Sequence, residues 1–534
     1  MMITGNLFVR FCNILIFFIT VIFCDVILAA GLPVLFEPGR RDPVSDKIVD
    51  VGKNVRWAVS IGTPTYAKPV ISNGKVLIGT LNNTVYDPKR SGSRSVLYCF
   101  DEQNGTMLWQ LPMPKNFTTP FVDSYCVGIS STPLVIGQRV YLTANSGEVL
   151  CLDMNGLADG NDGEFQDEAL LFAFNEEKPV PPLGKTDADV IWMFNMYEKF
   201  KSRPHDTNNA DIFEHEGLLY VKTGNAPDNT HVRLRNPEAP SLLVFDKETG
   251  KPLARDDFDI GCDISHGQWC NPILVHRGGK SYILYGGGNG VVYCVAVPDN
   301  AKLRKTDGKL PSELSRELPH ELPHELPSEL PRLPTIWKFH GDPRAQSNSK
   351  EPVPPFVMGM GSPSYTCLPP PKFDTETDLI FMLFGHDAWN GAKPFRSWLA
   401  AFRFSDQGGD ITQSALVWGT PNITGGAVAP LGLEGGFLYM ADRRGNFYCF
   451  ETATGKTCWT LQLKGDIWAA PLLADGKIYI GTDRRLFYVL QSGRTPKILG
   501  EMRMPDRIFA PATAHGNTLY VAGDGFLYAI DGEK

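Results

Sequence analysis

The amino-acid sequence predicts an all-β fold in which a unit of four short antiparallel strands is repeated eight times around a ring. Three observations lead to this prediction. Gly and Pro are frequent, at 52 and 41 of 534 residues, as expected for short strands joined by turns. One motif recurs along the chain, and its last copy ends on a strand that nothing follows. Because an exposed strand edge invites aggregation, we expect another part of the chain to cover it.

The recurring motif combines a strand, a turn and a second strand. "VLYCFDEQNGTMLWQL" (96–111) returns as "NFYCFETATGKTCWTLQL" (446–463), and the final copy is "FLYAIDGEK". Each copy follows a strand pair such as "APLLADGKIYIGT" (470–482), whose Asp-Gly favours a tight hairpin. In the D-x-x-T-G segment, Asp accepts backbone hydrogen bonds and Gly adopts a positive φ. Eight such units can be followed along the chain.

The first recognisable strand supplies the missing partner. "NVRWAVSIG" (54–62) is a fourth-strand sequence, although it stands at the start of the repeats. We expect it to complete the last unit and to close the ring, which leaves only short, protected edges. The sequence therefore predicts an eight-bladed β-propeller of four-stranded blades. It forms a single domain over residues 54–534, with insertions at 157–188 and 299–334.

A Trp follows the turn in most units. A large flat ring suits the packing of neighbouring sheets, so we interpret these residues as structural. The six docking positions are Trp57, Trp109, Trp192, Trp337, Trp418 and Trp459.

The cysteines mostly follow the same repeat. Cys99, Cys151, Cys294 and Cys449 occupy a slot on the third strand that is Ala529 in the last copy, so we expect small buried packing residues there. Nine cysteines lie beyond residue 30, an odd number, so at least one has no intrachain partner. Cys262 and Cys270, in "GCDISHGQWC", are the candidate disulfide pair.

The first thirty residues differ from the rest of the chain. The apolar run after Arg10 is read either as a secretory signal cut after Ala30 or as an uncleaved membrane anchor, and residues 31–53 as a linker. Either reading predicts export to the periplasm or the cell exterior, with membrane contact only through this segment. The net charge of −8 argues against nucleic acid as a partner.

The repeats resemble a known family. "YCFDEQNGTMLW" and "YCFETATGKTCW" resemble the tryptophan-docking repeat of pyrroloquinoline quinone (PQQ) dehydrogenases. The same repeat occurs in PQQ-like propellers without the cofactor, including the lipoprotein of the outer-membrane barrel-assembly machinery. "DMNGLADGNDGEFQDE", "PSLLVFDKETGK" and "ISHGQW" together are similar to exported PQQ-like propellers of bacteria such as planctomycetes. The resemblance implies an architecture and leaves the function open.

Polar residues gather in the segments that lead into units three and four and in the long insertion of unit three. In a propeller these segments share one face, so we expect their side chains to meet at one channel mouth, with His205 and His266 as the main ligand-pocket candidates. Hydrogen bonding to loop backbone is the structural alternative. The full candidate set is His205, Asp206, Asn208, His231, Asp263, His266 and Trp269.

Two insertions raise separate questions. The acidic loop "DMNGLADGNDGEFQDE" suggests either a solvated loop or a calcium site at Asp159, Asn161 and Asp162, with a spacing that departs from an EF-hand. The repeat "xELP" (309–334) has Pro nearly every fourth residue, which forbids a continuous helix. We expect residues 310–333 to be dispensable.

The favoured function is an exported binding or scaffold module without redox chemistry, with a protein or small-molecule ligand at the channel mouth. The alternative is a PQQ- and calcium-dependent quinoprotein oxidoreductase acting on alcohols or sugars. The family's catalytic pattern typically includes two adjacent Cys, which this sequence lacks, and a Glu, Asn and Asp set that has no matching positions here. A hydrolase or lyase using the His cluster is the third hypothesis.

Overall fold

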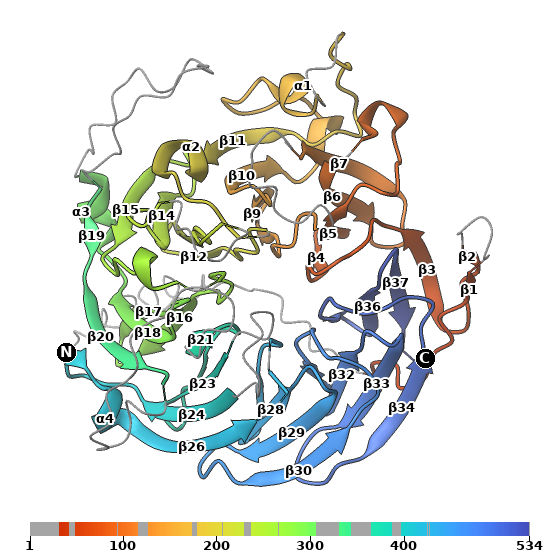
Figure 1. Ribbon diagram of the computed structural model, residues 1–534. Helices are drawn as coiled ribbons and strands as arrows, with labels where there is room; N and C mark the ends of the chain where they lie inside the picture. Colours follow the sequence, from red (N-terminus) through yellow and green to blue (C-terminus); the bar gives the residue numbers. More distant parts are fainter. Residues whose placement is uncertain are drawn as a thin grey trace, which may run out of the picture.

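The computed structural model describes residues 31–41, 48–92, 94–115, 127–173, 179–205, 207–228, 236–264, 266–305, 330–342, 365–386, 397–423, 425–426 and 428–532. The strands form eight sheets arranged radially around one axis, and a ninth small sheet lies outside the ring (Figure 1). The eight-bladed β-propeller predicted from the repeats is therefore confirmed.

Four blades come from the first half of the repeats. Their strands, from the axis outward, are β4 (Val70–Ser72), β5 (Lys75–Leu81), β6 (Arg94–Asp101), β7 (Met107–Pro114); β8 (Leu134–Ile136), β9 (Arg139–Thr143), β10 (Glu148–Asp153), β11 (Val190–Asn195); β12 (Phe213–His215), β13 (Leu218–Lys222), β14 (Leu242–Asp246), β15 (Pro252–Asp256); and β16 (Ile273–Arg277), β17 (Lys280–Gly286), β18 (Val291–Ala296), β20 (Thr335–His340).

The second half supplies the others. Blade five has a divided inner strand, and blade eight takes its outer strand from the N-terminal side. These strands are β21 (Tyr365–Cys367) with β22 (Lys372–Asp374), β23 (Leu379–His386), β24 (Ser397–Arg403), β26 (Leu416–Ile423); β27 (Gly432–Glu434), β28 (Phe437–Ala441), β29 (Asn446–Glu451), β30 (Thr457–Gln462); β31 (Leu472–Ala474), β32 (Lys477–Gly481), β33 (Leu486–Gln491), β34 (Ile498–Arg503); and β35 (Thr513–His515), β36 (Thr518–Ala522), β37 (Phe526–Asp531), β3 (Val55–Ser60).

The ring closes between the two ends of the repeats. β3 pairs antiparallel with β37, so that Trp57 stands opposite Ala529 and Ser60 opposite Phe526. The predicted strand exchange is present, and the last strand of the chain has its partner. In Figure 1 the orange β3 lies on the rim beside the dark blue β37.

A bulge recurs at the same point of each blade, between the third and fourth strands. There the slot residue faces the docking position, as Cys99 faces Trp109 and Cys449 faces Trp459. The slot is small because a large indole stands opposite it, and all four slot cysteines are buried. The indole then reaches the next blade: Trp109 Nε1 donates a 2.9 Å hydrogen bond to the backbone oxygen of Met154.

The turn glycine completes this contact. Gly250 has φ of 68°, and a Cβ placed there would lie 2.4 Å from the ring of Trp192. Glycine is therefore needed at this position for two reasons: the turn requires a positive φ, and the indole of the preceding blade leaves no room for a Cβ. Trp57, Trp192, Trp418 and Trp459 donate equivalent hydrogen bonds to Glu102, Lys247, Thr452 and Gly493.

Blades three and seven have no Trp at the docking position. Ala254 and Gly500 stand there instead, opposite Val244 and Val489. In each case a segment from outside the four strands packs into the same core: Leu333 in blade three, and Leu32 with Phe36 in blade seven. A Cβ at Gly500 would lie 2.4 Å from the backbone oxygen of Val34. In these two blades, apolar side chains from an additional segment thus occupy the core in place of the docking Trp.

The added segment at blade three comes from the fourth unit's insertion. β19 (Arg332–Leu333) pairs in parallel with β15 as a fifth strand. Leu333, on β19, is 3% exposed and packs in the core with Val244 and Ala254. Leu330, just before β19, is 8% exposed and packs in the neighbouring core with Trp192 and Phe245. The expectation that residues 310–333 are wholly dispensable is therefore wrong at its C-terminal end. β25 (Gly409–Asp410) makes the same kind of parallel edge on β20.

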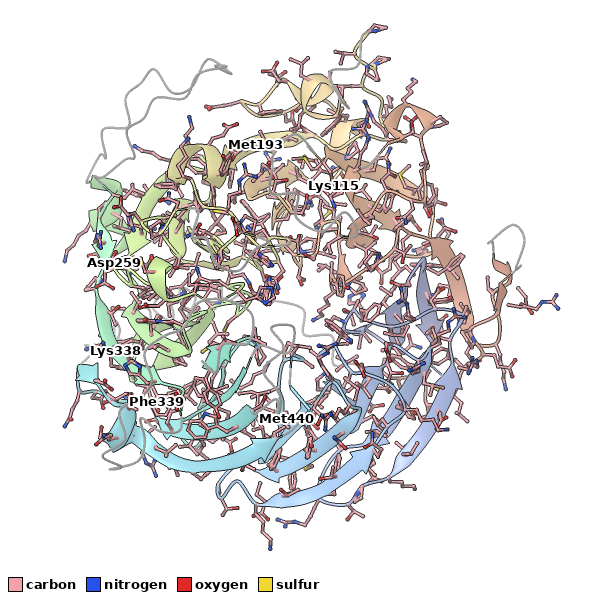
Figure 2. All side chains as sticks on the ribbon, viewed as in Figure 1. Lys115, Met193, Asp259, Lys338, Phe339 and Met440 are labelled. Atoms are coloured by element: carbon pink, nitrogen blue, oxygen red, sulfur yellow. The ribbon has the colours of Figure 1, made fainter. Side chains whose placement is uncertain are left out.

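The remaining elements lie on links or outside the ring. β1 (Arg40–Arg41) and β2 (Ile48–Asp50) form the separate small sheet. Side chains fill the blades out to a rim that carries Asp259 and Lys338 (Figure 2). The short helices are η1 (Pro88–Arg90), η2 (Gly156–Ala158), α1 (Glu168–Leu171), α2 (Met196–Phe200), η3 (Gly261–Asp263), α3 (Asn300–Lys305) and α4 (Thr412–Ala415).

The two faces of the ring carry different links. Antiparallel order places the links between consecutive blades on the same face as the links between second and third strands. We call that side of the ring the inter-blade face. The links between third and fourth strands, including the acidic loop after β10 and the link after β18 that begins with α3, start from the opposite face.

Candidate functional site

The inter-blade face carries the side chains predicted from the sequence. Asp206 and His231 lie outside the described residues. His205 and Asn208 are on the link from blade two to blade three, and Asp263, His266 and Trp269 are on the next link. The five described candidates therefore come from two neighbouring links.

His205, His266 and Trp269 form one aromatic cluster. The ring centroids of His205 and His266 are 4.4 Å apart, and those of His266 and Trp269 are 4.6 Å apart. Both pairs meet edge to face, and the two imidazoles are 3% and 5% exposed. The structure brings the two histidines together, but their rings touch, so no ligand has room between them.

One imidazole nitrogen of this cluster and the nearby Asn208 side chain contact loop backbone. His205 Nδ1 lies 3.2 Å from the backbone oxygen of Pro227. Asn208 Oδ1 accepts a hydrogen bond from the Ala210 amide, while Nδ2 is buried with no partner among the described residues. Asp263, on η3, points to solvent. This arrangement suits the joining of two links better than acid–base chemistry on a bound substrate.

The proposed disulfide between Cys262 and Cys270 is not present. Both residues carry free thiols, and Cys262 is exposed whereas Cys270 is buried. Cys270 Sγ points into the blade, where it donates to the backbone oxygen of Pro369 at 3.3 Å. Cys262 lies within η3 (Gly261–Asp263) at the surface, whereas Cys270 precedes β16 and is buried in the blade.

The calcium candidates belong to a loop held by its own hydrogen bonds. Asn161 donates to Glu168 and accepts from Gln166, and Asp159 accepts from Asn155. Within the described ranges, no group of three or more His, Cys, Asp or Glu side chains lies close enough to hold a metal ion. A calcium ion at Asp159, Asn161 and Asp162 stays a prediction.

A calcium-bound quinone requires a free aromatic face and several oxygen ligands. At Trp269 the ring of His266 stands 4.6 Å away at 79°. The nearest predicted oxygen donors are either turned to solvent, as in Asp263, or already used, as in Asn208. The described residues therefore do not fit PQQ with calcium at this cluster, and no redox step follows from it.

Buried charge lies beside the same links. Lys222, at the end of β13, is fully buried and donates from Nζ to Asn209 Oδ1 at 2.6 Å. Burial lowers the pKa of Lys222 to about 7, and burial also raises the pKa of Asp211. Asp211 Oδ1 accepts from the Thr132 amide at 2.6 Å, which ties blade three to blade two. These groups connect the links around blade three.

A second aromatic cluster occupies the other side of the inter-blade face. Tyr66, Trp468 and Phe509 come from the links into blades one, seven and eight, and we call them the aromatic triad. Tyr66 and Phe509 have centroids 5.5 Å apart, and Trp468 and Phe509 have centroids 5.8 Å apart at 87°. All three side chains are partly exposed. Unlike the His cluster, the triad presents aromatic surface to solvent.

Arginines stack on the triad. The Arg443 guanidinium lies 4.7 Å from the Trp468 centroid, and that of Arg507 lies 5.2 Å from the Phe509 centroid. Exposed contacts of this kind contribute about 0.5–1 kcal/mol each. Arg507 also pairs with Asp524, whose Oδ2 lies 2.6 Å from Nη2. Cations and partly exposed rings thus alternate along this side.

Sequence reasoning missed the triad, although the repeats contain its signal. Tyr66, Trp269, Trp468 and Phe509 each stand four positions before the innermost strand of their blade. The same position is Ser130 in blade two and Asn209 in blade three. Aligning the links rather than the strands would have shown an aromatic residue recurring at the channel end of four blades.

Comparison with known proteins agrees with this architecture. The family model described as "Outer membrane protein assembly factor BamB" matches residues 404–497. Comparison with curated protein sequences gives no match. In the described residues, no helix combines the length and apolar character needed to cross a membrane.

Three solved structures have a similar backbone fold over most of the chain. Sqt1 from Saccharomyces cerevisiae has 7% identity and a TM-score of 0.52, over 90% of this chain and 99% of its own. BamB from Moraxella catarrhalis has 11% identity and a TM-score of 0.46, over 89% and 98%. The computationally designed Ika8 protein has 10% identity and a TM-score of 0.45, over 88% and 96%.

The fold and the repeat define a propeller of the tryptophan-docked type. With the family match over residues 404–497, they make the chain similar to PQQ-like β-propellers, and the match itself is confined to that stretch. The similarity concerns the architecture, whereas activity depends on the side chains that the blades present.

Proposed function

We propose that this protein is an exported binding or scaffold propeller that performs no redox chemistry and engages its partner at the inter-blade face. The family match supports a binding module, because the matched family is described as an assembly factor. A protein partner is favoured over a small molecule, since the exposed side chains are spread along several links instead of lining one pocket.

The observation that carries this proposal is the aromatic triad. Partly exposed Trp, Tyr and Phe next to arginine is the composition that protein interfaces favour. Such residues also carry most of the energy in measured interfaces. By contrast, the residue types that catalysis would use, His205 and His266, are buried against each other.

The redox part of the proposal is tested directly. Purified full-length protein is incubated with PQQ and Ca²⁺, and a dye-linked assay is run over a panel of alcohols and sugars. We expect no turnover above the protein-free control. Tight PQQ binding with turnover on any substrate would replace this proposal by the quinoprotein alternative.

Export is tested separately, because it depends on the N-terminal segment alone. We expect the full-length chain, produced in a host with a secretory pathway, to be recovered outside the cytoplasm. Mass spectrometry of the recovered chain should give an N-terminus at Gly31 if the leader is cut, or an intact Met1 if it is an anchor. Recovery only in the cytoplasm contradicts the export proposal.

A further inference from the structure

We propose that an arc of arginines beside the aromatic triad binds an acidic segment of a partner protein that carries an apolar anchor residue. The arc consists of Arg444, Arg484, Arg485 and Arg507, all exposed on the inter-blade face. This inference rests on the proposed binding function and specifies its surface and its partner. It concerns blades six to eight, away from the His cluster.

Two short turns present most of the arc. Residues 442–445 ("DRRG") join β28 to β29, and residues 482–485 ("TDRR") join β32 to β33. Asp442 is fully buried and accepts hydrogen bonds from the amides of Arg444 and Asn446. Asp483 Oδ1 accepts from the Asp466 amide at 2.7 Å. The aspartates are thus used to hold the turns, while the arginines project to solvent.

Arg485 adopts a backbone conformation that arginine disfavours. Its φ is 63°, in the left-handed region. The equivalent turn position is glycine in three other blades: Gly147, Gly290 and Gly445, with φ of 104°, 76° and 78°. A residue kept in an unfavourable conformation points to a role of its side chain outside folding. This backbone feature is independent of the charge pattern.

The arc is continuous with the triad. The side chain of Arg484 packs over Gly465, where an added Cβ would lie 2.7 Å from its Cγ. The Met504 amide donates to the Arg485 backbone oxygen at 2.8 Å, and the Asp524 amide donates to that of Arg507 at 2.9 Å. These contacts connect the turns of blades seven and eight to the link that carries Phe509. One extended segment can therefore reach both arginines and aromatic rings.

The arginines and aromatic rings indicate which side chains a partner should carry. Guanidinium groups pair with carboxylates in two parallel hydrogen bonds, and exposed rings accept an apolar or aromatic side chain. Among the described residues Arg507 is already paired with Asp524, whereas Arg444, Arg484 and Arg485 have no ion pair, so these three guanidinium groups are the ones offered to a partner. Like charges elsewhere would repel an acidic partner from other surfaces, which favours binding here.

The test uses a defined probe. A fluorescein-labelled peptide with one Trp between runs of Glu is titrated with full-length protein, and anisotropy is followed at low ionic strength. Matched peptides replace Glu by Gln, or Trp by Ala. We expect the Glu–Trp peptide to bind about tenfold more tightly than either, with an affinity that falls as salt increases. Equal binding of the Glu and Gln peptides overturns the proposal.

The decisive variant is R485G. Glycine suits the left-handed conformation, so this variant should fold at least as well as the parent, with an unchanged or raised Tm. We expect it, alone or with R484Q, to weaken peptide binding about tenfold, and W468A to do the same through loss of the anchor. R332Q, on the outer rim, is the matched control and should bind normally. Parental affinity in R485G with R484Q overturns the proposal.

The two proposals fail in different ways. Turnover with PQQ would overturn the binding-module function, whatever the peptide result. Absence of peptide binding, with no PQQ turnover, would leave a binding module whose partner contacts another surface. Binding of vesicles with anionic lipid headgroups, but not of the Glu–Trp peptide, would assign the arc to membranes and overturn the protein partner.

Discussion

Two aromatic clusters lie on opposite sides of the inter-blade face and differ in how much of their surface is exposed to solvent. Over blades three and four, His205, His266 and Trp269 contact one another and are closed off from solvent to varying degrees, with both imidazoles buried. Over blades seven, eight and one, the aromatic triad stays partly exposed and arginines stack on it. The first side joins links together, and the second presents a surface.

The difference shows that residue type alone does not locate function. Histidine and carboxylate attract attention in a sequence because they carry chemistry, yet here the histidines fill a core between links. Trp468 and Phe509 resemble the architectural Trp of the repeats, but they stand on links, before the innermost strands. Trp269 stands at the same position of its blade as Trp468 and Phe509, yet it packs against His266. The neighbours of a ring and its exposure, rather than its residue type, therefore separate the two groups.

The strongest test of this contrast removes the seam of the ring. Deletion of residues 54–62 takes away β3 and the start of the link that carries Tyr66. We expect aggregation or a fall in Tm of more than about 10 °C, because the edge of β37 is exposed and the Trp57 contact is lost. The triad side should lose its structure first. Unchanged Tm and solubility in calorimetry and sedimentation would contradict the closure.

A pair of substitutions compares the two sides directly. H266A opens a cavity in a buried cluster and should lower the free energy of unfolding by about 3 kcal/mol. W468A removes a partly exposed ring and should cost about 1 kcal/mol. Urea denaturation of the two variants checks the difference. Equal losses would show that the triad is as much a core as the His cluster.

Buried charge on the blade-three side should appear in the pH dependence of stability. The pKa of Lys222 is lowered to about 7, so between about pH 7 and 10 the folded state releases a proton that the unfolded state keeps. The free energy of unfolding therefore rises with pH in this window, by at most about 1.4 kcal/mol per unit, and is flat below it. K222M lacks this rise.

The comparison of parent and K222M isolates the effect, since other titrating groups are common to both. We expect the parent to gain about 2 kcal/mol relative to K222M between pH 7 and 9. R444Q, which changes an exposed arginine far from Lys222 in the sequence, is the control and should follow the parent. Parallel pH profiles of parent and K222M would show that Lys222 stays charged in the fold.

The smallest effect is expected for the "xELP" insertion. Replacing residues 310–329 by a short Gly-Ser linker, with β19 kept, should change stability by about 0.6 kcal/mol or less. The control is L333A, which should cost about 2 kcal/mol or more because Leu333 fills the core of blade three. A large loss on the linker replacement would show that the segment packs against the ring.

The architecture could be predicted because it depends on short sequence patterns that recur in each blade. Alternating apolar residues predicted the strands, and Asp-Gly and D-x-x-T-G predicted the turns. A fourth-strand sequence with its Trp57 at the N-terminal end of the repeats predicted the closure of the ring. The parts that escaped prediction depend on contacts between segments without a repeat. β19 has two residues, and Leu32 and Phe36 lie in a stretch read as a linker. No pattern of period two marks either segment.

The geometry of the candidate site was harder to predict, because it too depends on contacts between segments that do not repeat. Shared location on one face follows from topology, and His205 and His266 do meet there. Whether two side chains enclose a ligand or touch each other depends on distances that a sequence does not encode. The left-handed φ of Arg485 is equally invisible until the four-residue turns of several blades are superposed.

The segment that fills blade seven begins at the bond where the sequence predicts a possible leader cleavage. The Gly31 amide donates to Asp475 Oδ2 at 3.1 Å, just ahead of the buried Leu32. A peptidase cutting after Ala30 would turn that amide into an α-ammonium group facing a carboxylate. Maturation at this bond would therefore add an ion pair at the point where the chain enters the ring, whereas a cut a few residues later would remove Leu32 and Phe36 from the core. A cut after Ala30 would thus leave the segment that packs in blade seven intact.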